Sequence, residues 1–240
     1  MEQHEVILDG RAVSYALKRS RRRTIGFVIN EDGLRITAPQ FVSGREIERA
    51  LEAKSGWILS KLDKWAARPK APELSFESGE DLPWLGDRRK LVVEARGVRT
   101  RTALEEDIIR VSVDPQLSGD LRRTTIRNGL VRLYKREGEA LMTPKTQAFA
   151  DALGRRLRKV VIREQKSRWG SCASDGTIRL NWRLMGFPVE VIDYVCAHEA
   201  AHLVHPNHSR EFWQTVEAIC PDWKLRRDYM RANSNSHVYF

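Results

Sequence analysis

Four of the six histidines in this chain of 240 residues lie within eleven positions, and two of them flank a glutamate in the segment His198-Glu199-Ala200-Ala201-His202. On an α-helix, residues four apart lie one turn above each other on the same face, so two imidazoles can converge on one metal ion. Glu199 would sit about 100° round the helix from His198, beside the ion, where it can accept a proton from a water molecule. The pattern predicts a zinc-dependent hydrolase site with Glu199 as the general base.

A third ligand must come from outside this pair, because catalytic zinc is usually held by three protein ligands. His205 would share the same face of an unbroken helix, but it would lie about 10 Å along the axis from His198, too far for a ligand to the same ion. Pro206 disfavours helical geometry at His205, so the chain can leave the helix there and turn back with His208. We therefore expect His208 to be the third ligand. The outside candidates are Glu211 and Glu217.

The segment before the motif is apolar almost all round the expected helix. Pro188 suits a first helical turn, and the run from Val189 to Ala197 leads directly into the motif. A helix of this kind lies in the core, so we expect both histidines of the motif to be withdrawn from bulk water. The simplest alternative is a pair of hydrogen-bonded core histidines without a metal. Unpartnered imidazoles and a carboxylate would be costly there, and metal binding without catalysis would leave Glu199 without a role.

The elements that position this helix indicate an α+β fold. Ser43 and Glu46 form a capping box that opens a predicted helix over 44–67, and a second helix is predicted over 121–153 with a possible break at Pro144. The predicted strands are 6–8, 12–17, 25–29 and 34–37, which form a small β meander, then 91–93, 108–113, 160–163 and 177–180. Asp114-Pro115 suggests a boundary between two lobes. We expect a β-rich N-terminal lobe with one long helix over 1–115 and a catalytic lobe over 116–240.

The composition of the chain indicates its redox environment, its location and the charge of its partners. Three cysteines without a CxxC pair suggest neither a disulfide framework nor a cysteine zinc site, so we expect buried reduced thiols. The absence of a long apolar stretch and of a signal-peptide pattern leads us to expect no membrane association and a cytoplasmic location. The net charge of +10 favours polyanionic partners, and contact with a nucleotide or nucleic acid through the basic surface is open. The sequence does not indicate the oligomeric state.

Beyond the zinc motif, the sequence resembles the YgjP-like metallopeptidases, a bacterial family of zincin type, with the SprT-like and WLM proteases as more distant relatives. The similarity runs through most of the chain. It rests on the segments Arg35-Ile36-Thr37-Ala38-Pro39, Trp57-Ile58, Gln165-Lys166-Ser167-Arg168-Trp169-Gly170-Ser171-Cys172, Leu180-Asn181-Trp182-Arg183-Leu184, Tyr194-Val195-Cys196-Ala197-His198-Glu199, His202 and Asn207-His208-Ser209-Arg210-Glu211-Phe212-Trp213.

The resemblance implies a zincin-like catalytic lobe with a buried HExxH helix. It matches His198, His202 and His208 to the family's Zn²⁺ ligands and Glu199 to its catalytic glutamate. Ala200 stands where the family more often has leucine, which removes volume but no chemical group. It also suggests that the strand at 177–180 pairs with an extended peptide by strand addition, although an ordinary buried strand fits equally well.

The sequence is compatible with three functions. The leading one is a zinc metallopeptidase that cleaves peptides or unfolded proteins. The second is a metal-dependent nucleotide phosphohydrolase at the same site, which would need several cations near the metal. The third, a DNA-associated protease, rests on analogy with the SprT-like relatives. The available cations are Lys166, Arg168, Arg179 and Arg183; we expect Arg168 and Arg183 to pack against Trp169 and Trp182 instead.

Overall fold

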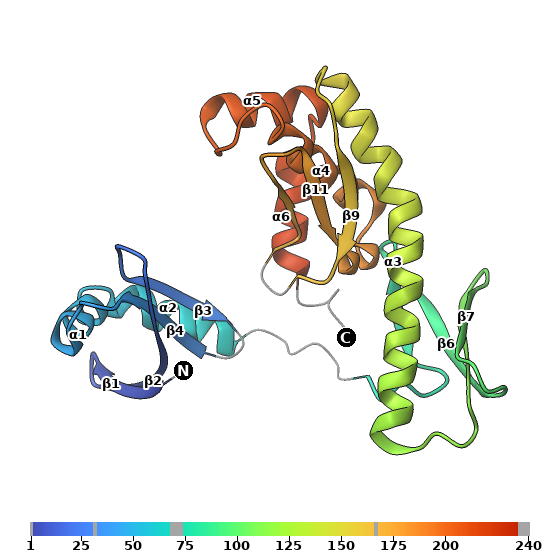
Figure 1. Ribbon diagram of the computed structural model, residues 1–240, viewed down its shortest axis with the longest axis horizontal. Helices are drawn as coiled ribbons and strands as arrows, with labels where there is room; N and C mark the ends of the chain where they lie inside the picture. Colours follow the sequence, from blue (N-terminus) through green and yellow to red (C-terminus); the bar gives the residue numbers. More distant parts are fainter. Residues whose placement is uncertain (1, 31–32, 68–73, 166–167, 235–240) are drawn as a thin grey trace. The chain divides into compact units, whose positions relative to one another are not determined.

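The computed structural model describes residues 2–30, 33–67, 74–165 and 168–234 (Figure 1). The chain forms two compact units, Met1–Pro69 and Lys70–Phe240. This division differs from the expected boundary near residue 115. The reason is packing: Leu91 and Ile109, from strands before that boundary, belong to the same hydrophobic core as Ile192, which lies on the helix of the zinc motif.

The first unit is a four-stranded sheet with two helices. Its strands are β1 (Glu2–Leu8), β2 (Arg11–Ser20), β3 (Gly26–Asn30) and β4 (Gly33–Pro39), in the order β1-β2-β4-β3. Because β2 pairs with β4 in parallel, the expected meander is wrong, although all four strands are present. The capping box of Ser43 and Glu46 is confirmed at the start of α1 (Gly44–Glu52). The single helix expected over 44–67 is in fact two, since α2 (Ser55–Ala66) begins after a break.

The second unit begins with another four-stranded sheet and a long helix. The strands are β5 (Asp81–Trp84), β6 (Asp87–Ala95), β7 (Arg101–Leu104) and β8 (Ile108–Val113), in the order β5-β6-β8-β7. Helix α3 (Gly119–Ala152) then packs against β7, β8, β9 and α4 (Figure 1). The helix continues through Pro144, so the possible break does not occur. Two residues after Pro144, the Thr146 hydroxyl donates to the Met142 carbonyl at 2.7 Å.

The rest of the second unit carries the zinc motif. Strands β9 (Lys159–Arg163), β10 (Gly170–Cys172) and β11 (Thr177–Asn181) form a sheet in the order β10-β11-β9. They are followed by a 3₁₀ turn η1 (Trp182–Gly186) and by α4 (Val189–Ala201), α5 (Arg210–Ile219) and α6 (Trp223–Asn233). Since β11 is paired on both sides, it cannot accept an added strand, and the expectation for 177–180 is wrong. The free edge nearest α4 belongs to β10.

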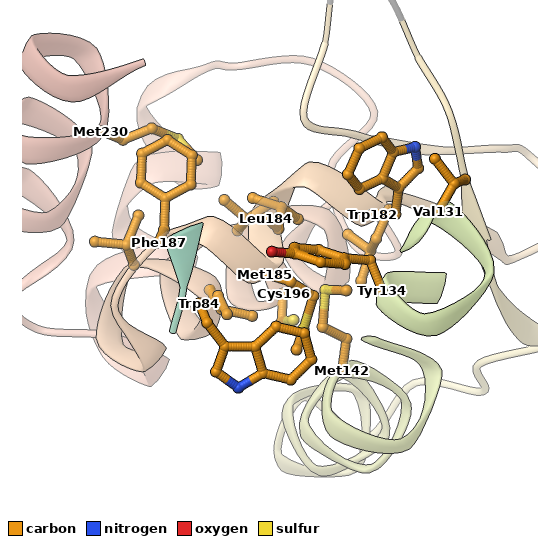
Figure 2. Close-up of a cluster of buried hydrophobic side chains, with 14 of the residues drawn as sticks. Trp84, Val131, Tyr134, Met142, Trp182, Leu184, Met185, Phe187, Cys196 and Met230 are labelled. Atoms are coloured by element: carbon orange, nitrogen blue, oxygen red, sulfur yellow. The ribbon is translucent and has the colours of Figure 1, made fainter. Parts of the chain in front are cut away.

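The core beneath α4 is built around Tyr134 of α3. Its ring lies between those of Trp84 and Trp182, edge to face with each, at centroid distances of 5.0 and 5.6 Å (Figure 2). The Tyr134 hydroxyl donates to the Pro83 carbonyl at 2.7 Å, which ties α3 to β5. These aromatic contacts join β5 and α3 to the turn η1, which leads into the helix of the zinc motif.

The turn between β5 and β6 docks against the start of α4. The Leu85 amide donates to the Met185 carbonyl at 2.6 Å, and Gly86 adopts a φ of +87°. A Cβ on Gly86 would lie 2.8 Å from the Pro188 ring, so only glycine permits this approach. The contact fixes where α4 begins. Within the described part of the chain, no helix combines the length and apolar character needed to cross a membrane.

Candidate metal centre

The structure brings together the three histidines that the sequence singled out. His198 lies in the last turn of α4, His202 is its C-cap, and His208 lies in the loop before α5. One ring nitrogen of each histidine is within 4.8 Å of the others. The Nε2 atoms of His198 and His208 are 3.0 Å apart. Three imidazole nitrogens converging from separate turns form a donor set that suits Zn²⁺.

The chain turns back at the place that the sequence predicted. Helix α4 ends at Ala201, and the His205 amide still donates to the Ala201 carbonyl at 3.0 Å before Pro206 ends the turn. Ser209 then caps α5 by accepting from the Phe212 amide at 3.4 Å. The cap sets the direction of α5, and the short loop between the two helices holds His208 over the end of α4.

Phe212 packs against all three histidines. Its ring is fully buried, and its centroid lies 5.0 Å from that of His198, 4.5 Å from His202 and 4.8 Å from His208. Rings packed this closely have few alternative rotamers, so Phe212 holds the donor set in place. Sequence reasoning gave Phe212 no role of its own. The only signal was its position, four residues after His208 and at the start of an amphipathic helix.

His205 orients a neighbouring imidazole through its backbone. Its carbonyl accepts a hydrogen bond from Nδ1 of His202 at 3.0 Å. Since a carbonyl can only accept, Nδ1 of His202 carries the proton and Nε2 is left with its lone pair. A hydrogen bond of this kind, from the other ring nitrogen, commonly orients histidine ligands of metal ions. The His205 side chain is not one of the three that converge.

Burial favours the uncharged form of two of the imidazoles, those of His198 and His202. The pKa of His198 is lowered to about 3, chiefly by burial and further by the neighbouring His202 and His208. Burial also lowers the pKa of His202, against the opposing effect of the His205 carbonyl. The Nδ1 atom of His198 is buried without a hydrogen-bond partner among the described residues. Neutral histidines are the form that binds metal, so the residues present fit a divalent cation.

Glu199 lies beside this group, on the wall of a cavity. Its side chain is 5% exposed, and its Oε2 atom has no hydrogen-bond partner in the described structure. Burial raises the pKa of Glu199 to about 8, although the positive charge of Arg168 acts in the opposite direction. A cation held by the histidines would likewise favour the ionised carboxylate. A buried carboxylate of this kind is typical of a general base.

Gly170 on β10 leaves the space that Glu199 fills. A Cβ on this glycine would lie 2.6 Å from both Cγ and Oε1 of Glu199, closer than any real contact. The carboxylate therefore packs directly on the backbone of β10. The glycine of the segment Arg168-Trp169-Gly170-Ser171 is explained by this contact, which the sequence alone did not reveal.

The cavity in front of Glu199 has a volume of about 410 Å³. One wall is formed by the three histidines and Glu199, and the other by β10 and the residues that follow it. Cys172 lies on this wall, and burial raises the pKa of its thiol to about 11, so the thiol stays protonated. All three cysteines are free, as expected, although Cys172 is only half-buried.

The predicted cations fall in different places. Arg168 lines the cavity with Glu199. Arg183 instead stacks on Trp182, with its Cζ atom 4.5 Å from the ring centroid, and pairs with Glu164 at 2.8 Å. The expected packing is therefore present for Arg183, whereas Arg168 faces the cavity. Arg179 lies on β11 and does not line the cavity, and Lys166 lies outside the described residues. Glu211 and Glu217 are not part of the histidine group.

The α+β fold carries a cavity with three convergent histidines, which is the arrangement of a metal-dependent enzyme. The family described as "YgjP-like, metallopeptidase domain" matches residues 23–233, so this chain belongs to that family. The chain also resembles the solved structure of the metallopeptidase zymogen abylysin of Pyrococcus abyssi, with 29% identity and a TM-score of 0.35 over 40% of this chain and 97% of that one. A search of curated proteins gave no significant match.

Proposed function

We propose that this chain is a zinc-dependent peptidase in which His198, His202 and His208 bind the metal and Glu199 is the general base. The observation that carries the proposal is the juxtaposition of the buried Glu199 carboxylate, whose Oε2 atom has no partner in the described structure, with three convergent imidazoles on one cavity. Zinc, when bound, supplies a Lewis acid that polarises a carbonyl and makes water a better nucleophile. Family membership supports peptide hydrolysis as the reaction.

Glu199 would accept the proton from the attacking water and later return it to the leaving amine. Its Oε2 atom has no competing hydrogen bond within the described chain. The close packing of the carboxylate on Gly170 restricts its movement towards β10. A glutamate held in this way needs little reorganisation during proton transfer.

The edge of β10 is suited to hold an extended peptide. Its residues line the cavity, and on its other side β10 pairs with β11 from Gly170↔Leu180 to Cys172↔Ile178. The outer edge therefore presents backbone donors and acceptors to the cavity, and an extended substrate would bind there by strand addition. We therefore propose that the substrate pairs with β10 and not with β11, because β11 is already paired on both sides.

The test is a comparison of Glu199→Gln with the unaltered protein, both loaded with zinc. The amide keeps the shape of the side chain but cannot accept a proton. We expect equal zinc content, an unchanged melting temperature and a loss of peptide cleavage of more than about a hundredfold. Full cleavage by a pure, zinc-loaded variant would remove Glu199 from this role. Cleavage that does not depend on zinc would refute the proposal as a whole.

A further inference from the structure

A second cavity of about 370 Å³ adjoins the histidine group. His198 and His208 line both this cavity and the one that contains Glu199, so the two cavities share the candidate metal centre as a common wall. The other walls of the second cavity are aromatic near the histidines and cationic on α6. A peptide whose scissile bond lies at the histidines would therefore place a neighbouring group in this cavity.

Two arginines reach the second cavity from one face of α6. Arg227 and Arg231 are four residues apart, and Ser234 follows after three more, so all three lie along the same side of the helix. No aspartate or glutamate lines the cavity among the described residues. The acidic group near both arginines is Asp228, which is 65% exposed and lies 3.5 Å from Arg227 and 4.0 Å from Arg231. The two positive charges are thus poorly neutralised on the cavity side.

The guanidinium of Arg227 is fixed by aromatic rings. Its Cζ atom lies 5.6 Å from the centroid of Trp213 and 4.6 Å from that of Trp223, and these two rings stack on each other at 4.3 Å. Trp213 in turn lies 5.7 Å from His198 and 5.8 Å from His208, centroid to centroid. The Trp213 indole therefore packs against both the histidines and the Arg227 guanidinium. A guanidinium held in this way loses little side-chain entropy when it binds an anion.

Tyr194 adds a third donor to the cavity. It lies one turn before His198 on α4, and the two rings meet at a centroid distance of 5.8 Å. The side chain lines the cavity together with Arg227 and Arg231, and a tyrosine hydroxyl can donate a hydrogen bond. Three hydrogen-bond donors, with no carboxylate among the described lining residues, form a site for an anion.

We propose that this second cavity binds a carboxylate of the peptide substrate, close to the scissile bond, through Arg227, Arg231 and Tyr194. The inference rests on the proposed peptidase function and specifies its substrate class. The carboxylate can belong to an acidic side chain or to the free C-terminus of the peptide, and both present the same group. Trp169, Trp213 and Met230 would pack against the apolar part of the bound residue.

The experiment measures both binding and cleavage on the full chain. Binding uses the zinc-free protein and short peptides in three forms: a glutamate peptide with an amidated end, its glutamine counterpart with an amidated end, and the glutamine counterpart with a free carboxylate. Tryptophan fluorescence reports on the site, because Trp169 and Trp213 line it. We expect one of the two carboxylate peptides to bind at least about tenfold more tightly than the neutral one, and the preferred form identifies the source of the carboxylate.

Variants assign the preference to the cavity. Arg231→Gln should remove most of the preference for the carboxylate peptide over the neutral one, both in binding and in kcat/KM. Lys224→Gln is the matched control, since Lys224 is a cation of the same helix that does not line the cavity. Equal binding of all three peptides by the unaltered protein, or a preference that survives in both Arg231→Gln and Arg227→Gln, would overturn the inference. Cleavage of the neutral peptide would leave the peptidase proposal intact in either case.

Discussion

The Nε2 atoms of His198 and His208 face each other at 3.0 Å, although ten residues and the end of a helix separate them. Two imidazole nitrogens at this distance can be joined by one hydrogen bond or can present both lone pairs to one cation. The low pKa of His198, together with the third ring nitrogen from His202 nearby, favours the cation. The choice between the two is open to direct measurement.

We predict about one zinc ion per chain, with His198→Ala and His202→Ala abolishing binding and His208→Ala weakening it strongly. The matched control is His205→Ala, which removes an imidazole outside the group but keeps the backbone carbonyl that accepts from His202. Metal analysis of the dialysed proteins checks the prediction. Full zinc occupancy in His208→Ala, together with loss of zinc in His205→Ala, would show that His208 is wrongly assigned as the third ligand.

Gly170→Ala should damage catalysis while sparing the metal. The added methyl group would lie 2.6 Å from Glu199, so the carboxylate must move, and the three atoms nearest to the methyl group all belong to Glu199. A displacement of about 1 Å at a reacting group can cost about a hundredfold in rate, and we expect kcat to fall at least tenfold with zinc content unchanged. Gly56→Ala is the control, because a Cβ there meets nothing within 4 Å. Unchanged kcat in a folded Gly170→Ala variant would contradict this role.

Part of the candidate site could be predicted from the sequence because helical spacing alone aligns His198 with His202. The role of Pro206 in ending the turn could also be predicted, since proline restricts the residue before it. In contrast, the contact of Gly170 with Glu199 joins two segments almost thirty residues apart. The cavity at Arg227 depends on how α6 packs on α4. Neither the spacing nor the composition of a single segment contains that information.

The fold shows the same difference between local and long-range features. The α+β class and the capping box of Ser43 follow from short-range patterns, and both are confirmed. The parallel pairing of β2 with β4 was missed, because alternation of apolar residues marks a strand but not its neighbour. The sequence indicated a possible break of α3 at Pro144, which does not occur. The helix continues because the surrounding residues, such as Met142 and Thr146, are fully buried and held by packing on both sides of it.

The ionisation of Glu164 should make the free energy of unfolding depend on pH in the acid range. Partial burial raises the pKa of Glu164, but hydrogen bonds and charge from Arg183 and Arg127 outweigh this effect, so the pKa is lower in the folded state than in the unfolded one. A lowered pKa stabilises the fold above the unfolded value, about 4.3, and this contribution is lost as pH falls through the folded value. Glu164→Gln should therefore lower the free energy of unfolding by about 1 kcal/mol at pH 7, which corresponds to a fall of about 2–4 °C in melting temperature. The fall should be smaller near pH 3.

Calorimetry of both proteins from pH 3 to pH 7 measures this difference. Glu80→Gln is unsuitable as a control because Glu80 accepts hydrogen bonds from backbone amides. Glu217→Gln is suitable, since Glu217 makes one distant contact with Lys224 at 3.7 Å on the surface. A difference that stays constant over the whole pH range would show that the Glu164 charge does not contribute.

The last prediction separates the peptidase from a nucleotide phosphohydrolase, and it starts from where charge lies during each reaction. Peptide hydrolysis develops one negative charge on one oxygen, whereas a nucleoside triphosphate already carries three or four and needs several cations around the metal. In the cavity that holds Glu199, Arg168 is the one lysine or arginine among the lining residues that the structure describes.

Arg168→Ala and Arg183→Ala should therefore behave differently. Arg183 is held by Trp182 and Glu164, so its loss should lower the melting temperature and any hydrolytic activity together. Arg168 is exposed, and Arg168→Ala should leave the melting temperature unchanged and retain peptide cleavage. Both variants are assayed with peptides and with nucleoside triphosphates, at equal zinc content. The contrary result would be a KM for triphosphates raised at least about tenfold in Arg168→Ala, with peptide cleavage and melting temperature unchanged. That result would show that the cavity binds phosphate, and it would favour the phosphohydrolase over the peptidase.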